Sequence, residues 1–260
     1  MKKTFLFVVA FIGSYAQAQT NDSIPEISNK EFEYLGKTET DTVVKYGTTT
    51  QAVIRFGVNN LRTENQFTHS DFRYLGSSTF EIGLTARKPF SKDDNLLGLR
   101  YGVMFSYNML SPTDNRVFGI EGNQTNLQVS DKNLRKQFTY FKNSYVQIPI
   151  TLDFDFSKKE YNHANRKFVW NEGLNFGIGG YVGYNINSKQ FISYKDEFGN
   201  KVTEKHHGKW NVEDFNYGLM AYVGNRNYKL YAKYDLSPVF KNNAKDQYFW
   251  TLGIQLDLGN

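Results

Sequence analysis

The chain has 260 residues, a net charge of +5 at pH 7 and no cysteine, which excludes disulfides and thiol catalysis. Hydrophobic residues make up only 40 % of the chain while aromatic residues reach 17 %, a balance that favours β structure, where rings pack well on a pleated surface. Basic and acidic residues are interspersed along the chain, so the positive charge does not indicate a nucleic-acid partner.

The first eighteen residues predict a secretory signal peptide. Lys2 and Lys3 form its positive region, residues 4–15 form a short apolar core, and Ala16-Gln17-Ala18 is a typical cleavage site. The apolar core is too short to span a bilayer as a helix. We therefore expect a Gram-negative protein that is exported, cleaved before Gln19 and placed in the cell outer membrane.

Residues 19–46 are polar, and we expect them to form a periplasmic segment in which a short strand around Val43 and Val44 is one option. Residues 47–260 predict a single β-barrel domain, because polar and apolar residues alternate there with period two, the pattern of strands with two different faces. The alternating segments number eight, an even number as in bacterial single-chain barrels. They are 51–59, 79–87, 97–108, 146–156, 175–186, 216–223, 228–235 and 248–257.

The two faces of these segments differ in chemistry. One face carries aliphatic and aromatic side chains such as Ile148, and the other carries amides, charges and repeated glycines, which suit a narrow interior. A soluble β-sandwich or a lipocalin-like barrel would alternate in the same way. The glycines and the apolar outer face favour an all-β, transmembrane, antiparallel up-and-down barrel. We then expect Ile148→Arg to be costly and Gln147→Arg, on the polar face, to be milder.

The connections between the segments also differ in length. Connections 60–72, 111–138, 188–212 and 236–246 are longer on average than 88–96, 157–172 and 224–227. With both termini periplasmic, the longer set become external loops, as outer-membrane barrels show. Two external connections predict hairpins that continue past the membrane: residues 117–129 turn at Glu121-Gly122-Asn123, and residues 191–202 turn at Phe198-Gly199-Asn200.

Four stretches carry a family resemblance in order along the chain. They are Tyr145-Val-Gln-Ile-Pro-Ile-Thr-Leu, Gly177-Ile-Gly-Gly-Tyr-Val-Gly-Tyr, Asp214-Phe-Asn-Tyr-Gly-Leu and Tyr231-Ala-Lys-Tyr-Asp-Leu. They resemble successive strands of PorT-like outer-membrane β-barrel proteins, which are small barrels of the porin-family type. The resemblance covers residues 145 to about 240, whereas the N-terminal half matches only in pattern. It implies an outer-membrane barrel, and it brings no catalytic residue, cofactor or ligand site.

Ten charged residues are predicted to face the barrel interior as a charge network, five of them basic and five acidic. They are Arg55, Glu81, Arg87, Arg100, Asp153, Asp155, Lys229, Lys233, Asp235 and Asp257. An eight-stranded barrel has room only to be filled by side chains, and opposite charges in a low dielectric pair. We expect ion pairs among residues like Arg87, Arg100, Glu81 and Asp153 to close the lumen.

Catalytic and metal-binding patterns are weak. The four histidines, His69, His163, His206 and His207, all fall in predicted connections. Since adjacent residues of an extended segment point opposite ways, His206 and His207 favour a solvated loop over a metal site. His69 followed by Asp71 is the one candidate for a surface protease, and Asp93-Asp94-Asn95 lacks the spacing of a calcium loop. We predict no cofactor, metal site or catalytic residue.

The leading hypothesis is a non-enzymatic barrel that acts through its external loops or periplasmic tail in a structural, adhesion or secretion-associated role. A narrow porin or channel for small solutes is the alternative, and a surface enzyme is the third and least favoured. The expected partners are outer-membrane lipid, the barrel-insertion machinery and other envelope proteins.

Overall fold

The computed structural model describes residues 47–63, 71–91, 95–162, 167–171 and 173–258. All of them belong to one compact unit, Tyr46–Asn260. The predicted signal peptide, the predicted periplasmic segment, His69 and His163 lie outside the described residues.

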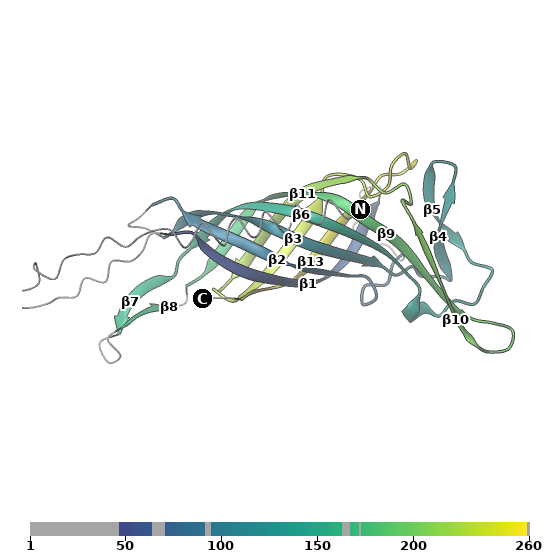
Figure 1. Ribbon diagram of the computed structural model, residues 1–260, viewed down its shortest axis with the longest axis horizontal. Helices are drawn as coiled ribbons and strands as arrows, with labels where there is room; N and C mark the ends of the chain where they lie inside the picture. The colour runs from purple at the N-terminus through teal and green to yellow at the C-terminus, as the bar shows by residue number, and fades with distance from the viewer. Residues whose placement is uncertain (1–46, 64–70, 92–94, 163–166, 172, 259–260) are drawn as a thin grey trace, which may run out of the picture. The chain divides into compact units, whose positions relative to one another are not determined.

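Eight long strands form a closed antiparallel barrel (Figure 1). Strands that follow one another in this set are hydrogen-bonded neighbours, and β1 pairs with β13 to close the sheet. Each predicted segment coincides with one of the strands, so the up-and-down barrel is confirmed. The strands are β1 (Thr49–Thr63), β2 (Ser78–Pro89), β3 (Leu97–Leu110), β6 (Tyr140–Asp155), β9 (Asn175–Lys195), β11 (Phe215–Gly224), β12 (Tyr228–Asp235) and β13 (Gln247–Leu258).

Three hairpins and one 3-10 turn complete the described structure. The predicted hairpins are present as β4 (Arg116–Glu121) with β5 (Gln124–Val129), and as the outer part of β9 with β10 (Lys201–Gly208). Their turns contain Gly122 and Gly199, whose φ angles of +61° and +81° suit glycine. A third hairpin, β7 (Lys158–Asn162) with β8 (Lys167–Asn171), occupies the long connection after β6, and η1 spans Lys136–Phe138. No helix among the described residues is long and apolar enough to cross a membrane.

One expectation about this region is wrong. The strand β10 continues to Gly208, so His206 and His207 lie in a strand rather than in a loop. The hairpin is longer than predicted because every residue from Lys201 to Gly208 pairs with β9. Polar and charged side chains dominate β10, and alternation of polar with apolar residues is therefore too weak there to mark a strand.

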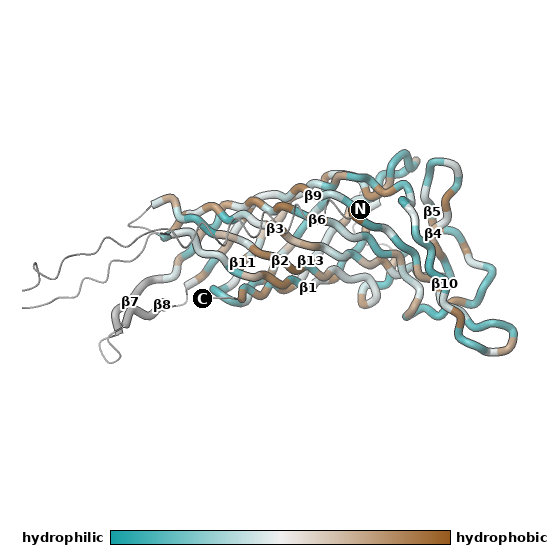
Figure 2. The backbone as a smooth tube through the Cα atoms, in the orientation of Figure 1, coloured by the Kyte–Doolittle hydropathy of each residue, from teal (hydrophilic) through white to brown (hydrophobic). Residues whose placement is uncertain are grey.

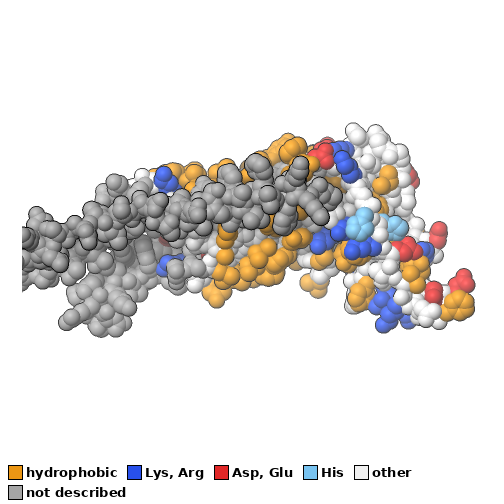
Figure 3. Space-filling view, in the orientation of Figure 1, with side chains coloured by type: hydrophobic (Ala, Val, Ile, Leu, Met, Phe, Trp, Pro, Cys, Tyr) orange, Lys and Arg blue, Asp and Glu red, His pale blue; other side chains and the backbone are white. Residues whose placement is uncertain are grey.

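The barrel reverses the usual distribution of polar and apolar side chains. On β6, Ile148 and Ile150 point outward and are about half exposed, whereas Gln147, Thr151 and Asp153 point inward and are buried. The same alternation recurs along the other barrel strands (Figure 2). It leaves a broad apolar band on the outside (Figure 3). Such a band would be unstable in water and suits the hydrocarbon core of a bilayer, so this is a transmembrane barrel.

The two ends of the barrel differ, and we name them by their connections. The end that carries the connections β1–β2, β3–β6, β9–β11 and β12–β13, with both predicted hairpins, is called the cap end. The opposite end, which carries the connections β2–β3, β6–β9 and β11–β12, is called the terminal end because β1 begins there and β13 ends there.

Candidate functional site

The interior near the terminal end is organised around Asp153. This carboxylate is fully buried and accepts hydrogen bonds from the guanidinium groups of Arg87 and Arg100, the latter over 3.2 Å from Nε to Oδ2. The hydroxyl of Tyr222 and the amide of Asn175 also donate to it, the amide over 3.2 Å. Buried charges are tolerated when hydrogen bonds satisfy them in this way.

Arg100 extends this group to a second carboxylate. Its Nη1 lies 2.9 Å from Oδ2 of Asp257, and Nζ of Lys229 lies 2.6 Å from the same oxygen. The amide Nε2 of Gln255 donates to Oδ1 of Asp257 over 2.6 Å. Strands β3 and β13, which are not neighbours in the sheet, are thereby joined across the interior.

A second ionic group forms around Glu81 toward the middle of the barrel. Nη1 of Arg55 lies 2.9 Å from Oε2 of Glu81, and Lys233 and Ser106 donate to Oε1, the hydroxyl over 3.1 Å. Nε of Arg55 also donates to Oε1 of Gln255 over 2.7 Å. Because Gln255 accepts from one group and donates to the other, the two groups form a single network.

The ten predicted charged residues therefore all lie on strands at inward positions, and nine are buried. Asp155 is only half-buried, where the amide of Asn95 donates to it over 3.2 Å. Asp235 is buried with Tyr181 and Asn216 as hydrogen-bond donors. Of the four residues named as examples of pairing, Arg87 and Arg100 share Asp153, whereas Glu81 pairs elsewhere, with Arg55 and Lys233.

Aromatic side chains fill the space between the charges. Tyr181, Tyr222 and Tyr231 form a buried cluster with Met220 inside the barrel. Glycine on the neighbouring strand makes room for Tyr222: a Cβ added to Gly177, its partner in the ladder, would lie 2.2 Å from the Tyr222 ring. Close approach of a large side chain explains this glycine, and the buried side chains around it leave the lumen packed rather than open.

The mouth at the cap end is closed by a second, apolar cluster, called here the aromatic cap. Phe118 of β4 lies at its centre, with ring centroids 4.8 Å from Phe141 and 5.3 Å from Phe240. Inward residues of four barrel strands meet loop residues there. The members are Leu61, Phe72, Leu110, Phe118, Phe141, Tyr145, Trp210, Val212, Val239, Phe240 and Phe249.

Polar contacts fix the β4–β5 hairpin over this mouth. The side-chain amide of Gln190 accepts from the backbone N–H of Phe118 over 2.7 Å and donates to its carbonyl over 2.9 Å. Asn243 makes the same reciprocal pair with the backbone of Thr125, at 2.9 and 2.8 Å. Sequence reasoning missed this closure, since alternation describes strands one at a time and gives no signal for contacts among loops.

Of the residues considered for catalysis or metal binding, Asp71 and His206 are engaged in other contacts. Asp71 pairs with Arg116 over 2.8 Å, and its proposed partner His69 lies outside the described residues. His206 lies 3.2 Å from Glu204, which also accepts from Lys132 over 2.5 Å and from Tyr194 over 2.7 Å. These hydrogen bonds, led by that from Lys132, lower the pKa of Glu204 to about 2. Within the described part of the chain, no group of three His, Asp or Glu residues could hold a metal ion.

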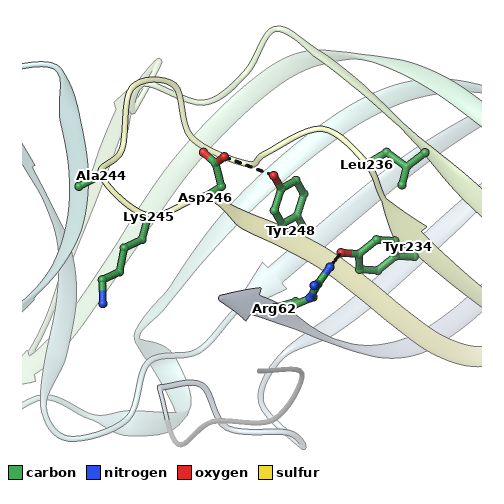
Figure 4. Close-up of a pocket in the computed structure, with 7 residues that line it drawn as sticks. All are labelled: Arg62, Tyr234, Leu236, Ala244, Lys245, Asp246 and Tyr248. Carbon is green, nitrogen blue, oxygen red and sulfur yellow. Dashed lines mark hydrogen bonds between the residues drawn. The ribbon is translucent and has the colours of Figure 1, made fainter. Parts of the chain in front are cut away.

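A pocket of about 490 Å³ lies on the outside of the barrel near the cap end (Figure 4). It is lined by Arg62, Tyr234, Leu236, Ala244, Lys245, Asp246 and Tyr248. Arg62 donates to the Tyr234 hydroxyl, and the Tyr248 hydroxyl donates to Asp246 over 3.3 Å. Rings with polar tips at this position match the aromatic girdle of a membrane barrel.

Comparisons with known proteins add little to what the fold itself shows. No protein-family model matches the chain, and no curated protein matches it, so membership of the PorT-like family stays a prediction. Among solved structures, the crystal structure of Neisserial surface protein A is similar over 82 % of this chain and 98 % of that one, with 11 % identity and a TM-score of 0.35. A similarity this distant indicates no function.

Proposed function

We propose that this protein is a non-enzymatic, non-conducting barrel of the outer membrane that acts through its external hairpins, in an adhesion or secretion-associated role. The observation that carries the proposal is the double closure of the lumen. The ionic network fills the terminal side and the middle, and the aromatic cap fills the mouth. A barrel closed in this way offers no path for solutes, so its surfaces must supply its function.

The orientation of the barrel follows from its connections. The connections at the cap end, which include both predicted hairpins, are longer than most of those at the terminal end. Since outer-membrane barrels have short periplasmic turns and longer external loops, the cap end faces outward from the cell.

The β9–β10 hairpin is the external feature best placed to meet a partner. Its tip presents Phe198, whose side chain is 88 % exposed, beside the turn at Gly199. Within the described residues β10 pairs with β9 alone, so its other edge offers unpaired backbone groups (Figure 1). An open strand edge next to an exposed ring suits binding by strand addition.

A photocrosslinking experiment in intact cells tests the proposal. A photoreactive phenylalanine analogue replaces Phe198, and a matched control carries it at Leu230, an outward position in the apolar band. We expect a discrete protein adduct from position 198 and only lipid adducts from position 230. No adduct at 198, together with steady open channels of the wild type in a planar bilayer, would favour the narrow channel instead.

A further inference from the structure

The outward surface where β6, β9 and β10 meet carries two adjacent rungs of basic and aromatic residues. In the first rung Lys142 of β6 lies opposite Lys189 of β9, which lies opposite His207 of β10. In the second, Tyr140 lies opposite Phe191, which lies opposite Lys205. Directly opposed residues of antiparallel strands share one face of the sheet. We call the set Tyr140, Lys142, Lys189, Phe191, Lys205 and His207 the basic face.

The lysines of this face lack an acidic partner in the part of the chain that the structure describes. Among the described residues, none of its three lysines forms an ion pair. Two acidic residues of the neighbouring connection are engaged elsewhere: Glu204, on the opposite face of β10, pairs with Lys132, and Asp214 pairs with Lys241 over 2.6 Å. Like charges placed directly opposite in a sheet are destabilising. An anion bound here would therefore relieve the repulsion between the opposed lysines.

The positive potential is also visible at His207. Burial, and after it the charges of Lys189 and Lys205, lower the pKa of this imidazole. Of these two causes, burial disfavours any charge, and only the lysine charges also favour an anion nearby.

Aromatic rings contact two of the three lysines of this face. The Tyr140 and Phe191 rings stack with centroids 4.7 Å apart, and Nζ of Lys205 lies 5.3 Å from the Phe191 ring. Nζ of Lys142 lies 4.4 Å from the ring of Tyr107, an outward residue of β3. Because Tyr107 pairs with Ser144, its ring lies nearer the apolar band than Lys142, and a ring below a cationic tip matches the boundary between acyl chains and headgroups.

The basic face begins where the apolar band ends. On β9 the exposed Ile186 precedes Lys189 by three residues, which is roughly 10 Å along a strand and roughly 7–8 Å along the membrane normal for a tilted one. In Figure 3 blue and pale-blue side chains gather directly beyond the hydrophobic band. This depth is that of lipid headgroups in the outer leaflet.

We propose that the basic face binds the phosphate groups of an anionic lipid in the external leaflet. The three lysines and His207 contact the phosphates. Tyr140 and Phe191 lie one rung further from the apolar band than Lys142 and Lys189, so their rings lie beside the headgroup. The inference rests on the outer-membrane placement proposed above but not on partner binding by the hairpin tip, so the two proposals fail separately.

Native mass spectrometry of the refolded full-length protein in detergent tests the site. The protein is titrated with diphosphorylated lipid A, with its monophosphorylated form and with phosphatidylcholine. The test variant is Lys142→Gln with Lys189→Gln and Lys205→Gln. The matched control removes the same charge from exposed lysines away from the two rungs, as Lys136→Gln with Lys195→Gln and Lys201→Gln. A heat-modifiability gel verifies that both variants are folded.

We expect binding to rank with the number of phosphates, and the test variant to bind diphosphorylated lipid A roughly 10- to 100-fold more weakly than the wild type. The control variant should change by less than about twofold. Equal weakening by both variants would mean a general charge effect and would overturn the proposal. Equal binding of phosphatidylcholine, or full displacement of the lipid by inorganic phosphate, would overturn it as well.

Discussion

Glu81→Gln removes the carboxylate at the centre of the second ionic group while keeping its size. Arg55 and Lys233 would then remain in the barrel interior without their counter-charge, since Glu81 is fully buried and both cations are at least nine-tenths buried. Removing one partner of a buried ion pair costs roughly 3–5 kcal/mol. We therefore expect the free energy of unfolding to fall by about that amount, measured by urea unfolding from lipid vesicles with tryptophan fluorescence.

Two further variants separate charge from packing in this experiment. Glu121→Gln removes a carboxylate at the exposed tip of the β4–β5 hairpin and should change stability by less than about 0.5 kcal/mol. Glu81→Gln combined with Lys233→Met removes one charge of each sign, so it should recover part of the loss, as a coupling energy in a double-mutant cycle. A loss below about 1 kcal/mol for Glu81→Gln, or strictly additive losses in the double variant, would refute the network as drawn.

Three other predictions concern the lipid face, the packing and the external hairpin. Ile148→Arg, in the apolar band, should cost roughly 2–4 kcal/mol near the bilayer midplane in the same unfolding assay, and an unchanged free energy would argue against lipid contact there. Gly177→Ala should cost roughly 1–3 kcal/mol because the new Cβ meets the Tyr222 ring, whereas Gly208→Ala, with neighbours no closer than 3.8 Å, should cost less than about 0.5 kcal/mol. The contact of Glu204 with Lys132 should weaken as the pH falls from about 4.5 toward about 2, because the folded-state pKa of Glu204 is lowered and its stabilisation is present only while it is ionised. The free energy that protects the β10 amides against hydrogen exchange should fall in that window by less than about 1 kcal/mol. A Glu204→Gln variant should show no such pH dependence.

The strands and their faces could be predicted because the side-chain period of a strand is two and each face here meets a different medium. This is why Ile148 was assigned outward and Asp153 inward. The register could not be predicted, since a shift of one strand by two residues keeps every face and changes every partner. Hence the sequence alone could not predict that Glu81 lies between Arg55 and Lys233 rather than near Arg87.

The same limit applies to the effect that we expected for a substitution in the barrel interior. Gln147→Arg was expected to be mild because its side chain faces polar groups. In the structure Gln147 is buried and accepts from Nζ of Lys233 over 2.7 Å, so an arginine there would meet a cation in a filled space. A polar face predicted from alternation describes the chemistry of a surface, and it does not tell whether that surface is wet or packed.

The bridging amide of Gln255 has a consequence for assembly. Its partners Arg55 and Asp257 lie on β1 and β13, the two strands whose pairing closes the barrel, and the Arg100–Asp257 contact joins residues 157 positions apart. An inserted sheet with an open seam would expose these cations to hydrocarbon without their acceptors. Closure of the seam satisfies them together, so the network favours an all-or-none final step and disfavours a partly zipped barrel that persists in the membrane.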